Sequence, residues 1–403
     1  MALTEHQDDV MNQVIDAIKS GHRRIVLKGS AGVGKTYMVN ELVKKLGMVN
    51  NTYLTAPTNK ALAVLRGKIN ILGNLEFSTI HSALKLRRKF DKDTGDPYFE
   101  QSFHPRYPPF AGCKLLIVDE ASMINNMLLG YLKDYNFPMI FIGDEKQLNP
   151  VKEEESPVFH QNWITFELTE IIRQGEGNPI IDLSRDIKSI WNKNSYVVQD
   201  AGYVFTEDRP KIIERLAEVN GTDELKYLAW SNAEVDIMNS SVRNKVYGTP
   251  KMIEQGETLV FNNPYKEGEY YTNQEILIQS LEEYEGSFIA GDGKVSLKVY
   301  RVNENIVVVQ EDSIRDFRKV ASVLKADVKK GKYDWRTYYG FVENFADFKY
   351  NHAITVHKSQ GSTYKDVILN VKNLNMNKNN KEKQRLFYTG ITRASNLLIL
   401  YNV

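Results

Sequence analysis

The sequence predicts an α/β protein whose domains are built on parallel sheets. Short apolar runs alternate with stretches of helical spacing over residues 1–175, a pattern typical of βαβ units. A glycine-rich loop joins one of these runs directly to a helical stretch. The alternation stops near residue 255 and returns after residue 345. With 403 residues, the chain is long enough for more than one compact unit.

Five apolar runs are the expected strands of the first sheet: residues 24–28, 51–56, 114–119, 139–143 and 165–168. Residues 86–110 interrupt this rhythm with Lys, Arg, Pro and aromatic residues, which indicates an insertion. Strand and helix patterns resume over residues 177–254 and 346–403, which we expect to form a second α/β domain. Residues 255–345 show alternating runs separated by turns and predict a small antiparallel β module. Residues 373–385, rich in Asn and Lys, are expected to form an exposed loop.

The composition is that of an ordinary globular protein, with 42% hydrophobic and 26% charged residues. Cys113 is the only cysteine, which excludes an internal disulfide framework and a cysteine-based zinc site. No apolar stretch approaches the roughly 20 residues that span a bilayer, and the first ten residues are polar. The net charge of +1 argues neither for nor against a nucleic-acid partner, because a basic groove can be balanced by acidic surface elsewhere.

Residues 29–36 read GSAGVGKT and lie between an apolar run and a helical stretch, the context of a phosphate-binding loop. Backbone N–H groups must curl around the phosphates, and glycine permits that close approach. Lys35 then reaches the β- and γ-phosphates, and the Thr36 hydroxyl binds Mg²⁺. The alternative is a glycine-rich turn that happens to contain Lys-Thr. The placement between strand and helix favours binding of a nucleoside triphosphate.

Two carboxylates follow the apolar run at 115–118. Asp119 is the expected metal-side acid, and Glu120 the expected base that orients water. A strand that ends in Asp-Glu is common, but this one follows a phosphate-binding loop. Gln147, after another apolar run, is a candidate for orienting water at the γ-phosphate. Arg173 and Arg393 are candidates for stabilising the charge that develops during hydrolysis, although most arginines are solvated surface residues.

Taken in order, these motifs resemble superfamily 1 helicases, specifically the 5′-to-3′ branch (superfamily 1B) of RecD-like and Dda-like proteins. The matching segments are Gln7, GSAGVGKT at 29–36, LTAPTNKAL at 54–62, STIHSAL at 78–84, VDEAS at 118–122, IGDEKQLNPV at 142–151, LTEIIRQ at 168–174, WSN at 230–232, ITVHKSQGSTY at 354–364 and LFYTGITRAS at 386–395. One such segment is weak evidence, whereas the ordered series covers nearly the whole chain.

The resemblance implies two RecA-like domains that hold one ATP and Mg²⁺ between them. Residues 1–85 and 111–176 would form the first, domain 1A, and residues 177–254 and 346–403 the second, domain 2A. The implied catalytic set is Lys35, Asp119, Glu120, Gln147, Arg173 and Arg393, with Thr36 and Asp119 at the metal. The implied nucleotide-binding set is Gln7, Gly29, Ser30, Ala31, Gly32, Val33, Gly34, Lys35, Thr36, Gln360 and Gly361. Gln7 also completes a capping box with Thr4, so it has two roles open to it.

Further residues are implied to contact a single nucleic-acid strand that crosses both domains. They are Pro57, Thr58, Thr79, His81, Thr355, His357, Lys358 and Ser359. Hydroxyls and Lys suit phosphates, and His can stack on a base. Residues 86–110 resemble a strand-separating pin (1B) with Phe99 as its wedge, the alternative being an aromatic that packs the pin onto a neighbour. Residues 255–345 match the position of an SH3-like insertion (2B). The Lys- and aromatic-rich stretch at 329–339 is either a nucleic-acid track or part of the module's core or a brace for the pin.

The function that these expectations favour is an ATP-dependent DNA helicase that moves 5′ to 3′ on single-stranded DNA and separates duplex strands. The alternative in the same family is a nucleic-acid-stimulated ATPase that displaces proteins without strong unwinding. A P-loop kinase would explain the loop but not Arg393 or the segment at 354–364. The expected partners are single-stranded DNA and its junctions with duplex, with single-strand-binding, replication or recombination proteins as further candidates. We expect a monomer in the cytoplasm, without membrane association, and in the host cytoplasm if a phage encodes it.

Overall fold

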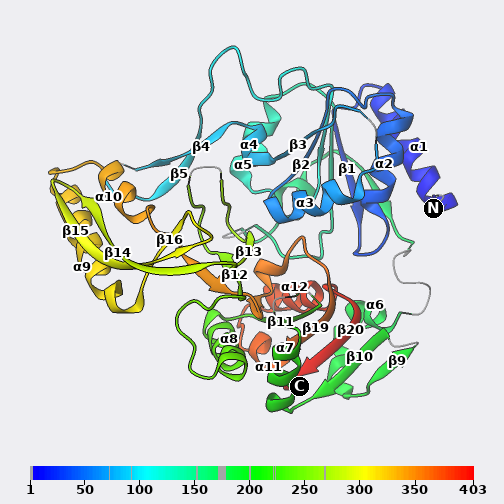
Figure 1. The fold of residues 1–403 in the computed structure, drawn as a ribbon. Coiled ribbons are helices and arrows are strands. Elements are labelled where there is room, and N and C mark those ends of the chain that lie inside the picture. The colour runs from blue at the N-terminus through cyan, green and yellow to red at the C-terminus, as the bar shows by residue number, and fades with distance from the viewer. Residues whose placement is uncertain are drawn as a thin grey trace.

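The computed structural model describes residues 3–71, 73–91, 93–150, 153–170, 178–198, 201–220, 222, 224–266 and 269–403. Two α/β domains lie one above the other in Figure 1, and a third, elongated part extends to the left of both. We call them the first domain, the second domain and the module. The antiparallel hairpin that projects from the first domain toward the module is called the pin.

The first domain is built on a parallel sheet with the strand order β3-β2-β6-β7-β1-β8. Its strands are β1 (Arg24–Gly29), β2 (Thr52–Ala56), β3 (Glu76–Thr79), β6 (Leu115–Val118), β7 (Met139–Gly143) and β8 (Ile164–Leu168). Its helices are α1 (Glu5–Lys19), α2 (Lys35–Lys45), α3 (Asn59–Lys68), α4 (Ile80–Ala83) and α5 (Asn126–Lys133), with η1 (Ala121–Met123) and η2 (Pro157–His160). Every residue of β6 and β7 is buried, as expected for central strands covered on both faces. Each of the five predicted strands is present within two residues of its expected ends.

The second domain contains a second sheet with the order β18-β11-β19-β20-β10-β9, parallel except for the edge strand β9. Its strands are β9 (Tyr196–Val198), β10 (Ala201–Thr206), β11 (Leu225–Ala229), β18 (Ala353–Thr355), β19 (Tyr364–Asn370) and β20 (Ala394–Tyr401). Its helices are α6 (Pro179–Arg185), α7 (Arg209–Glu218), α8 (Asn232–Tyr247), α11 (Val371–Asn375) and α12 (Asn380–Ile391), with η3 (Ile187–Asn192) and η5 (His357–Ser359). The chain therefore leaves this sheet after α8 and returns to it at β18.

The described residues of the module form two antiparallel sheets and three helices. The first sheet, which we call the base of the module, pairs β12 (Thr258–Phe261) with β13 (Glu275–Leu277) and β17 (Phe348–Tyr350). The second sheet contains β14 (Leu281–Ala290), β15 (Gly293–Val302) and β16 (Ile306–Val309). The helices η4 (Glu311–Ser313), α9 (Ile314–Lys329) and α10 (Trp335–Val342) follow. The expectation of a β module was therefore incomplete. Phe317, Val320 and Leu324 recur at helical spacing and pack α9 against β14, β15 and β16.

The expected loop at 373–385 was also wrong in part. Residues 371–375 belong to α11, and α12 begins at Asn380. Asn373 is buried, and its Oδ1 accepts hydrogen bonds from the backbone N–H groups of Trp230 (2.8 Å) and Ser231 (3.0 Å). The polar composition here therefore belongs in part to a buried connection, in which the Asn373 amide is hydrogen-bonded to the backbone of the second domain.

The pin is formed by β4 (Leu86–Phe90) and β5 (Pro97–Gln101), and its tip contacts the module. The ring of Phe90 stacks on Tyr339 of α10 at 3.7 Å between centroids, and the Tyr339 hydroxyl donates to the carbonyl of Gly95 at 2.9 Å. Gly95 has φ +72°, and a Cβ there would lie 2.2 Å from the Trp335 ring. Glycine is thus required at the turn, and the aromatic residues of α10 brace the pin.

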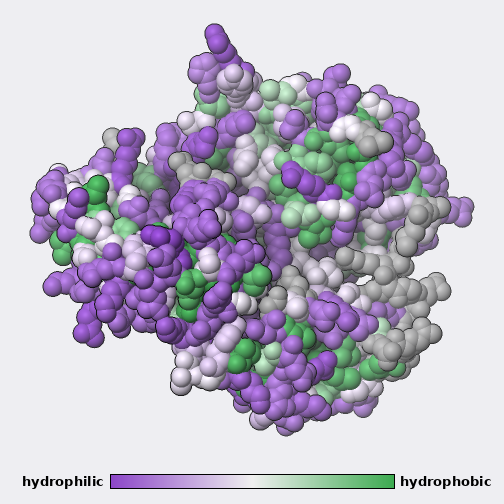
Figure 2. All heavy atoms as spheres, in the orientation of Figure 1, coloured by the Kyte–Doolittle hydropathy of each residue, from purple (hydrophilic) through white to green (hydrophobic). Residues whose placement is uncertain are grey.

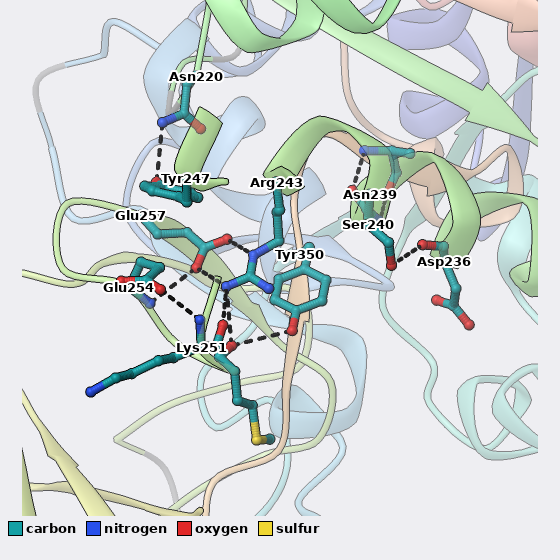
Figure 3. A network of polar contacts seen from close by, with 12 residues as sticks. Asn220, Asp236, Asn239, Ser240, Arg243, Tyr247, Lys251, Glu254, Glu257 and Tyr350 are labelled. Carbon is teal, nitrogen blue, oxygen red and sulfur yellow. Dashed lines mark hydrogen bonds and ion pairs between the residues drawn. The ribbon is translucent and has the colours of Figure 1, made fainter. Parts of the chain in front are cut away.

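A buried ion pair fixes the base of the module to the second domain (Figure 3). Arg243 on α8 and Glu257, which precedes β12, are 4% and 1% exposed, and their Nη2 and Oε2 atoms are 3.0 Å apart. Arg243 also donates to the Lys251 carbonyl at 2.8 Å, and its guanidinium lies 4.0 Å from the centre of the Tyr350 ring on β17. One side chain therefore holds both chain segments that connect the module to the second domain.

The visible face of the molecule is mostly hydrophilic, and hydrophobic residues form separate small patches on it (Figure 2). Among the helices of the described residues, none is long and apolar enough to cross a bilayer. Cys113 is half-buried, and burial raises the pKa of its thiol to about 12, which suits a cysteine that packs without reacting.

Glu257→Gln is expected to destabilise the protein by about 3–5 kcal/mol, because it leaves the Arg243 guanidinium buried without a carboxylate. Thermal and urea unfolding measure the loss. Glu282→Gln is the matched control, since its exposed pair with Arg301 (2.9 Å) is expected to change stability by less than about 0.5 kcal/mol. Equal losses in the two variants would contradict the assignment of the Arg243 pair as the clamp of the module.

Candidate functional site

A cavity of about 350 Å³ lies between the first and second domains. Its lining from the first domain is Gln7, Ala31, Gly32, Gly34, Lys35, Thr36, Tyr37, Ala61, Val64, Lys68, Asp119, Glu120 and Gln147, and from the second domain Gly361, Ser362, Thr363, Thr392 and Arg393. The volume is within the range of small-molecule sites. Residues from segments more than 300 positions apart in sequence are thereby brought to one cavity.

The loop from β1 to α2 has the backbone that a phosphate-binding loop requires. Gly32 and Gly34 have φ of +89° and +75°, and Gly34 is the N-cap of α2. A Cβ on Gly29 would lie 2.7 Å from Val33 and 3.1 Å from the Leu168 carbonyl, so the loop packs closely against β8. Nζ of Lys35 donates to the carbonyls of Gly29 (2.7 Å) and Ser30 (2.9 Å). The N-terminus of α2 and this ammonium group therefore face the cavity together.

Asp119 and Glu120 lie at the carboxyl end of β6, beside Lys35. Burial, and then the charge of Glu120, raise the pKa of Asp119 to about 6, while Lys35 and Lys68 act in the opposite direction. Glu120 has φ +50° and ψ +45°, a left-handed conformation that is unusual for a residue with a side chain. Its backbone N–H donates to Asp119 Oδ1 at 2.9 Å. The strained turn fixes where the two carboxylates lie relative to each other.

The donors at this end of the cavity fit Mg²⁺. Thr36 supplies a hydroxyl and Asp119 a carboxylate, and Mg²⁺ is usually bound by one or two carboxylates together with phosphates and water. The described residues contain no group of three or more His, Cys, Asp or Glu side chains that could hold a metal alone.

The loop after β7 carries Gln147, which is buried next to Asp144. Gln147 Nε2 lies 3.5 Å from Asp144 Oδ2, while Gln147 Oε1 is buried with no hydrogen-bond partner among the described residues. Tyr388 of α12 donates to the same Asp144 oxygen at 2.6 Å and accepts a hydrogen bond from the backbone N–H of Ala31 at 3.4 Å. Burial and the Asp144 charge raise the pKa of Tyr388, so it remains a donor. One tyrosine of the second domain thus contacts both the phosphate-binding loop and the Gln147 loop.

Arg393 is 5% exposed at the second-domain wall of the cavity. Its Nε donates to the Thr389 carbonyl (3.1 Å), Nη1 to the Ser362 carbonyl (3.0 Å) and Nη2 to the Thr392 hydroxyl (3.3 Å). A guanidinium has five N–H groups, so two remain beyond these contacts with described residues. Arg173 lies outside the described residues, and its expected role stays a prediction.

The other expected nucleotide-binding residues are distributed around the same cavity. Gln7 forms the expected capping box with Thr4 and donates from Nε2 to the Val33 carbonyl at 3.0 Å. It therefore joins α1 to the phosphate-binding loop and lines the cavity. Gln360 donates to the Leu148 carbonyl at 3.0 Å, across the domain boundary. Gly361 has φ +73°, and a Cβ there would lie 2.9 Å from Ala61 of the first domain.

The expected strand-contacting residues of the first domain lie at helix N-termini. Thr58 follows Pro57 and caps α3, accepting from the Ala61 N–H at 3.2 Å, and Thr79 caps α4 in the same way at Ser82. His81 lies 5.0 Å from Phe99 between ring centroids, and burial lowers the pKa of His81, so its neutral form is favoured. Phe99 is 40% exposed and lies in the middle of the pin, paired with Arg88, rather than at its tip.

The expected strand-contacting residues of the second domain lie in η5 or just before it. Thr355 accepts from the Lys358 N–H at 3.4 Å, and Lys358 Nζ donates to Asn262 Oδ1 at 3.3 Å. Burial, and then the charge of Lys349, lower the pKa of Lys358. Burial also lowers the pKa of His357, although the carboxylate of Glu382, 3.3 Å away, acts in the opposite direction. Ser359 is fully buried, and its hydroxyl donates to the Val356 carbonyl at 2.7 Å. Its side chain serves the local fold in this structure.

The sequence interpretation missed three residues, of which Lys68 lines the cavity and Tyr388 and Asp144 hold the loop that carries Gln147. Tyr388 and Asp144 were inside the recognised segments, but they were not singled out. Lys68, at the end of α3, lines the cavity and acts on the charge of Asp119. The sequence did offer a signal for Tyr388, because it lies in the same segment as Arg393, about one helical turn before it. The sequence offered no signal for Lys68, because only the packing of α3 brings this residue to the cavity.

Comparison with known proteins agrees with this architecture. A family described as an AAA domain matches residues 2–209, more than half of the chain, and one described as a UvrD-like helicase C-terminal domain matches residues 350–401. The ATP-dependent DNA helicase dda of Enterobacteria phage T4 is 29% identical over 97% of both chains. The chain belongs to the AAA-domain family, as a RecD-like superfamily 1B helicase. It is therefore an enzyme of the ATP-dependent helicase class.

More distant relatives share the same fold along the whole chain. The RecD subunit of the RecBCD enzyme from Buchnera aphidicola (subsp. Schizaphis graminum) is 22% identical over 94% of this chain and 70% of that protein. The structure of Pif1 helicase from Bacteroides, in complex with ADP-AlF3 and ssDNA, superposes with a TM-score of 0.55, at 19% identity and over 100% of this chain and 93% of that one. Pif1 from Candida albicans gives 0.52, at 18% identity and 100% and 95% coverage. The expected fold, two RecA-like domains with antiparallel insertions, is confirmed, and the second insertion also contains α9 and α10. The residue boundaries of the four parts stay predictions.

Tyr388→Phe is expected to lower ATP turnover roughly tenfold, because Asp144 loses a charge-assisted hydrogen bond worth about 1.5–3 kcal/mol at the place where the domains meet. Steady-state ATP hydrolysis measures kcat and KM. Tyr98→Phe, at a 46% exposed position on the pin, is the matched control. Unchanged kcat in Tyr388→Phe would show that the hydroxyl only stabilises the fold.

Proposed function

We propose that this helicase binds Mg²⁺-ATP in the cavity between its domains, moves 5′ to 3′ on single-stranded DNA and separates duplex strands with the pin. The observation that carries the proposal is the cavity itself, because it joins the phosphate-binding loop and two carboxylates to a buried arginine of the second domain. The helicase dda of phage T4 acts on DNA by its name, and the Bacteroides structure contains ssDNA.

The chemistry of hydrolysis follows from the positions of the side chains. Lys35 would leave the carbonyls of Gly29 and Ser30 for the β- and γ-phosphates, and Thr36 and Asp119 would hold Mg²⁺. Bound Mg²⁺ supplies charge neutralisation at the phosphates. Glu120 would orient the attacking water and accept its proton, and Gln147 would hold that water through its unpaired Oε1.

Arg393 links this chemistry to domain movement. Its two remaining N–H groups would bind the γ-phosphate oxygens as charge develops there, and its other N–H groups stay on carbonyl and hydroxyl groups of the second domain. Loss of the γ-phosphate removes that contact, so the domains are held together less tightly after hydrolysis. Single-stranded DNA bound at α3 and at η5 would be moved as these two elements change their separation.

We propose that the pin acts on the duplex. Its base belongs to the first domain, and its tip is held by the hydrogen bond from Tyr339 to the Gly95 carbonyl. The ring of Phe99 on the pin lies next to that of His81 on α4. An aromatic side chain can stack on the terminal base pair at a junction and compete with base stacking.

DNA duplexes with only a 5′ or only a 3′ single-stranded tail test the function directly. ATP-dependent strand separation is expected on the 5′-tailed substrate, and Glu120→Gln is expected to bind ATP and lose hydrolysis by at least 100-fold, since the water loses its base. A fluorescent strand-displacement assay and a phosphate-release assay provide the readings. DNA-stimulated hydrolysis without strand separation on either substrate would favour the alternative, a motor that mainly displaces proteins.

Phe99→Ala is expected to slow unwinding about tenfold, since one aromatic–base stack is worth about 1–3 kcal/mol. Translocation on single-stranded DNA, followed by the release of a dye at the strand end, is expected to change less than twofold. Tyr107→Ala, at a 71% exposed aromatic of the same insertion, is the control. Equal losses of unwinding and translocation would assign Phe99 to packing against His81.

A further inference from the structure

One lysine of the first domain contacts both of the other parts of the molecule. Lys60 lies in the first turn of α3, two residues after Thr58. Its Nζ lies 3.2 Å from Oε1 of Glu275, the first residue of β13 in the module. The same Nζ lies 3.5 Å from the Tyr364 hydroxyl and 5.3 Å from the centre of its ring, in the second domain. A single ammonium group thus joins three parts of the chain.

The contact lies on the proposed path of the nucleic-acid strand. Lys60 and Glu275 line one cavity together with Thr355 and Lys358, two of the expected strand-contacting residues, and with Lys349. That cavity measures about 30 Å³, which is enough for one or two waters, whereas sites for molecules of nucleotide size are roughly tenfold larger. A strand that passed through this cavity from the N-terminus of α3 to Thr355 would have to separate Lys60 from Glu275.

The chemistry of the pair matches that of a lysine–phosphate contact. Glu275 presents a carboxylate oxygen to Lys60 at the distance at which a phosphate oxygen would bind. The side chains of Lys60 and Glu275 are 26% and 29% exposed, so the pair is partly solvated and can exchange partners. By contrast, the Arg243–Glu257 pair that anchors the module is almost fully buried.

We propose that Glu275 occupies the place of a strand phosphate on Lys60, and that the pair is a gate which single-stranded DNA opens when it binds. Lys60 is then a further phosphate-binding residue, and the Glu275 carboxylate of the module competes with the strand phosphate for its ammonium group. The inference rests on the proposed function, because it requires a strand along α3 and η5. Binding exchanges one anion for another on Lys60, so this contact releases no counterion in the unsubstituted protein.

Equilibrium binding of a fluorescent oligo(dT) strand to the full chain, without nucleotide and from 50 to 300 mM salt, tests the gate. Glu275→Gln is expected to tighten binding about threefold at the lowest salt and to steepen the dependence of log K on log salt by roughly 0.7. Lys60→Gln is expected to weaken binding, and adding Glu275→Gln to Lys60→Gln is expected to give no further change. Glu282→Gln, which breaks the exposed pair with Arg301 elsewhere in the module, is the matched control and is expected to bind as the unsubstituted chain does.

The outcomes separate the gate from the function on which it rests. Weaker or unchanged binding by Glu275→Gln, with normal binding by the unsubstituted chain, would overturn the gate and leave the proposed function standing. A gain that persists in the Lys60→Gln background would also overturn it, because the carboxylate would then act by general repulsion. Lack of oligo(dT) binding by the unsubstituted chain would instead count against the proposed function.

Discussion

The proposed nucleotide site depends on the hydrogen bonds that the second domain forms with the loop after β7. Tyr388 binds Asp144, Arg385 donates to the Gln147 carbonyl at 2.8 Å, and the Thr389 hydroxyl accepts from the Leu148 N–H at 3.3 Å. Gln360 holds the Leu148 carbonyl from the other side. The loop that presents Gln147 to the cavity therefore belongs to the first domain by sequence but takes its position from α12. A movement of α12 would therefore shift Gln147 and, through Tyr388, Ala31 of the phosphate-binding loop.

A second constraint arises because the pin and the module belong to different domains. The base of the pin is part of the first domain, while its tip is bound to α10 of a module that is inserted in the second. The buried Arg243–Glu257 pair makes the module base move with α8. Relative movement of the two domains must then be accommodated by the pin, by the contact at its tip or by the partly exposed Lys60–Glu275 pair. A partly solvated ion pair contributes little to stability, so we expect this contact to break before the buried Arg243–Glu257 pair does.

The sequence predicted the parts of this structure that depend on local chemistry. The phosphate-binding loop needs glycine where φ is positive and a strand and helix on either side, and all of this can be seen in residues 24–45. The apolar runs of the sheets were equally clear. The helices α9 and α10 were missed because short alternating runs nearby dominated the pattern, and α11 because buried asparagines look like loop residues until their partners are known. Lys68 and the Lys60–Glu275 pair depend on packing between segments far apart in sequence, which no local pattern encodes.

The hydroxyl groups along the proposed strand path differ in what they can still donate. The hydroxyls of Thr79 and Ser359 donate to Ser82 and to the Val356 carbonyl, so their protons are engaged within the protein. Among the described residues, the hydroxyls of Thr58 and Thr355 accept hydrogen bonds from the Ala61 and Lys358 N–H groups and donate none, so each has a proton available for a phosphate oxygen. Thr58 lies two residues before Lys60 in sequence, and Thr355 lines the cavity that Lys60 closes. The hydroxyls that keep a proton therefore lie near the Lys60 contact that joins the first domain, the second domain and the module, so opening of the Lys60–Glu275 pair would add an ammonium group beside them.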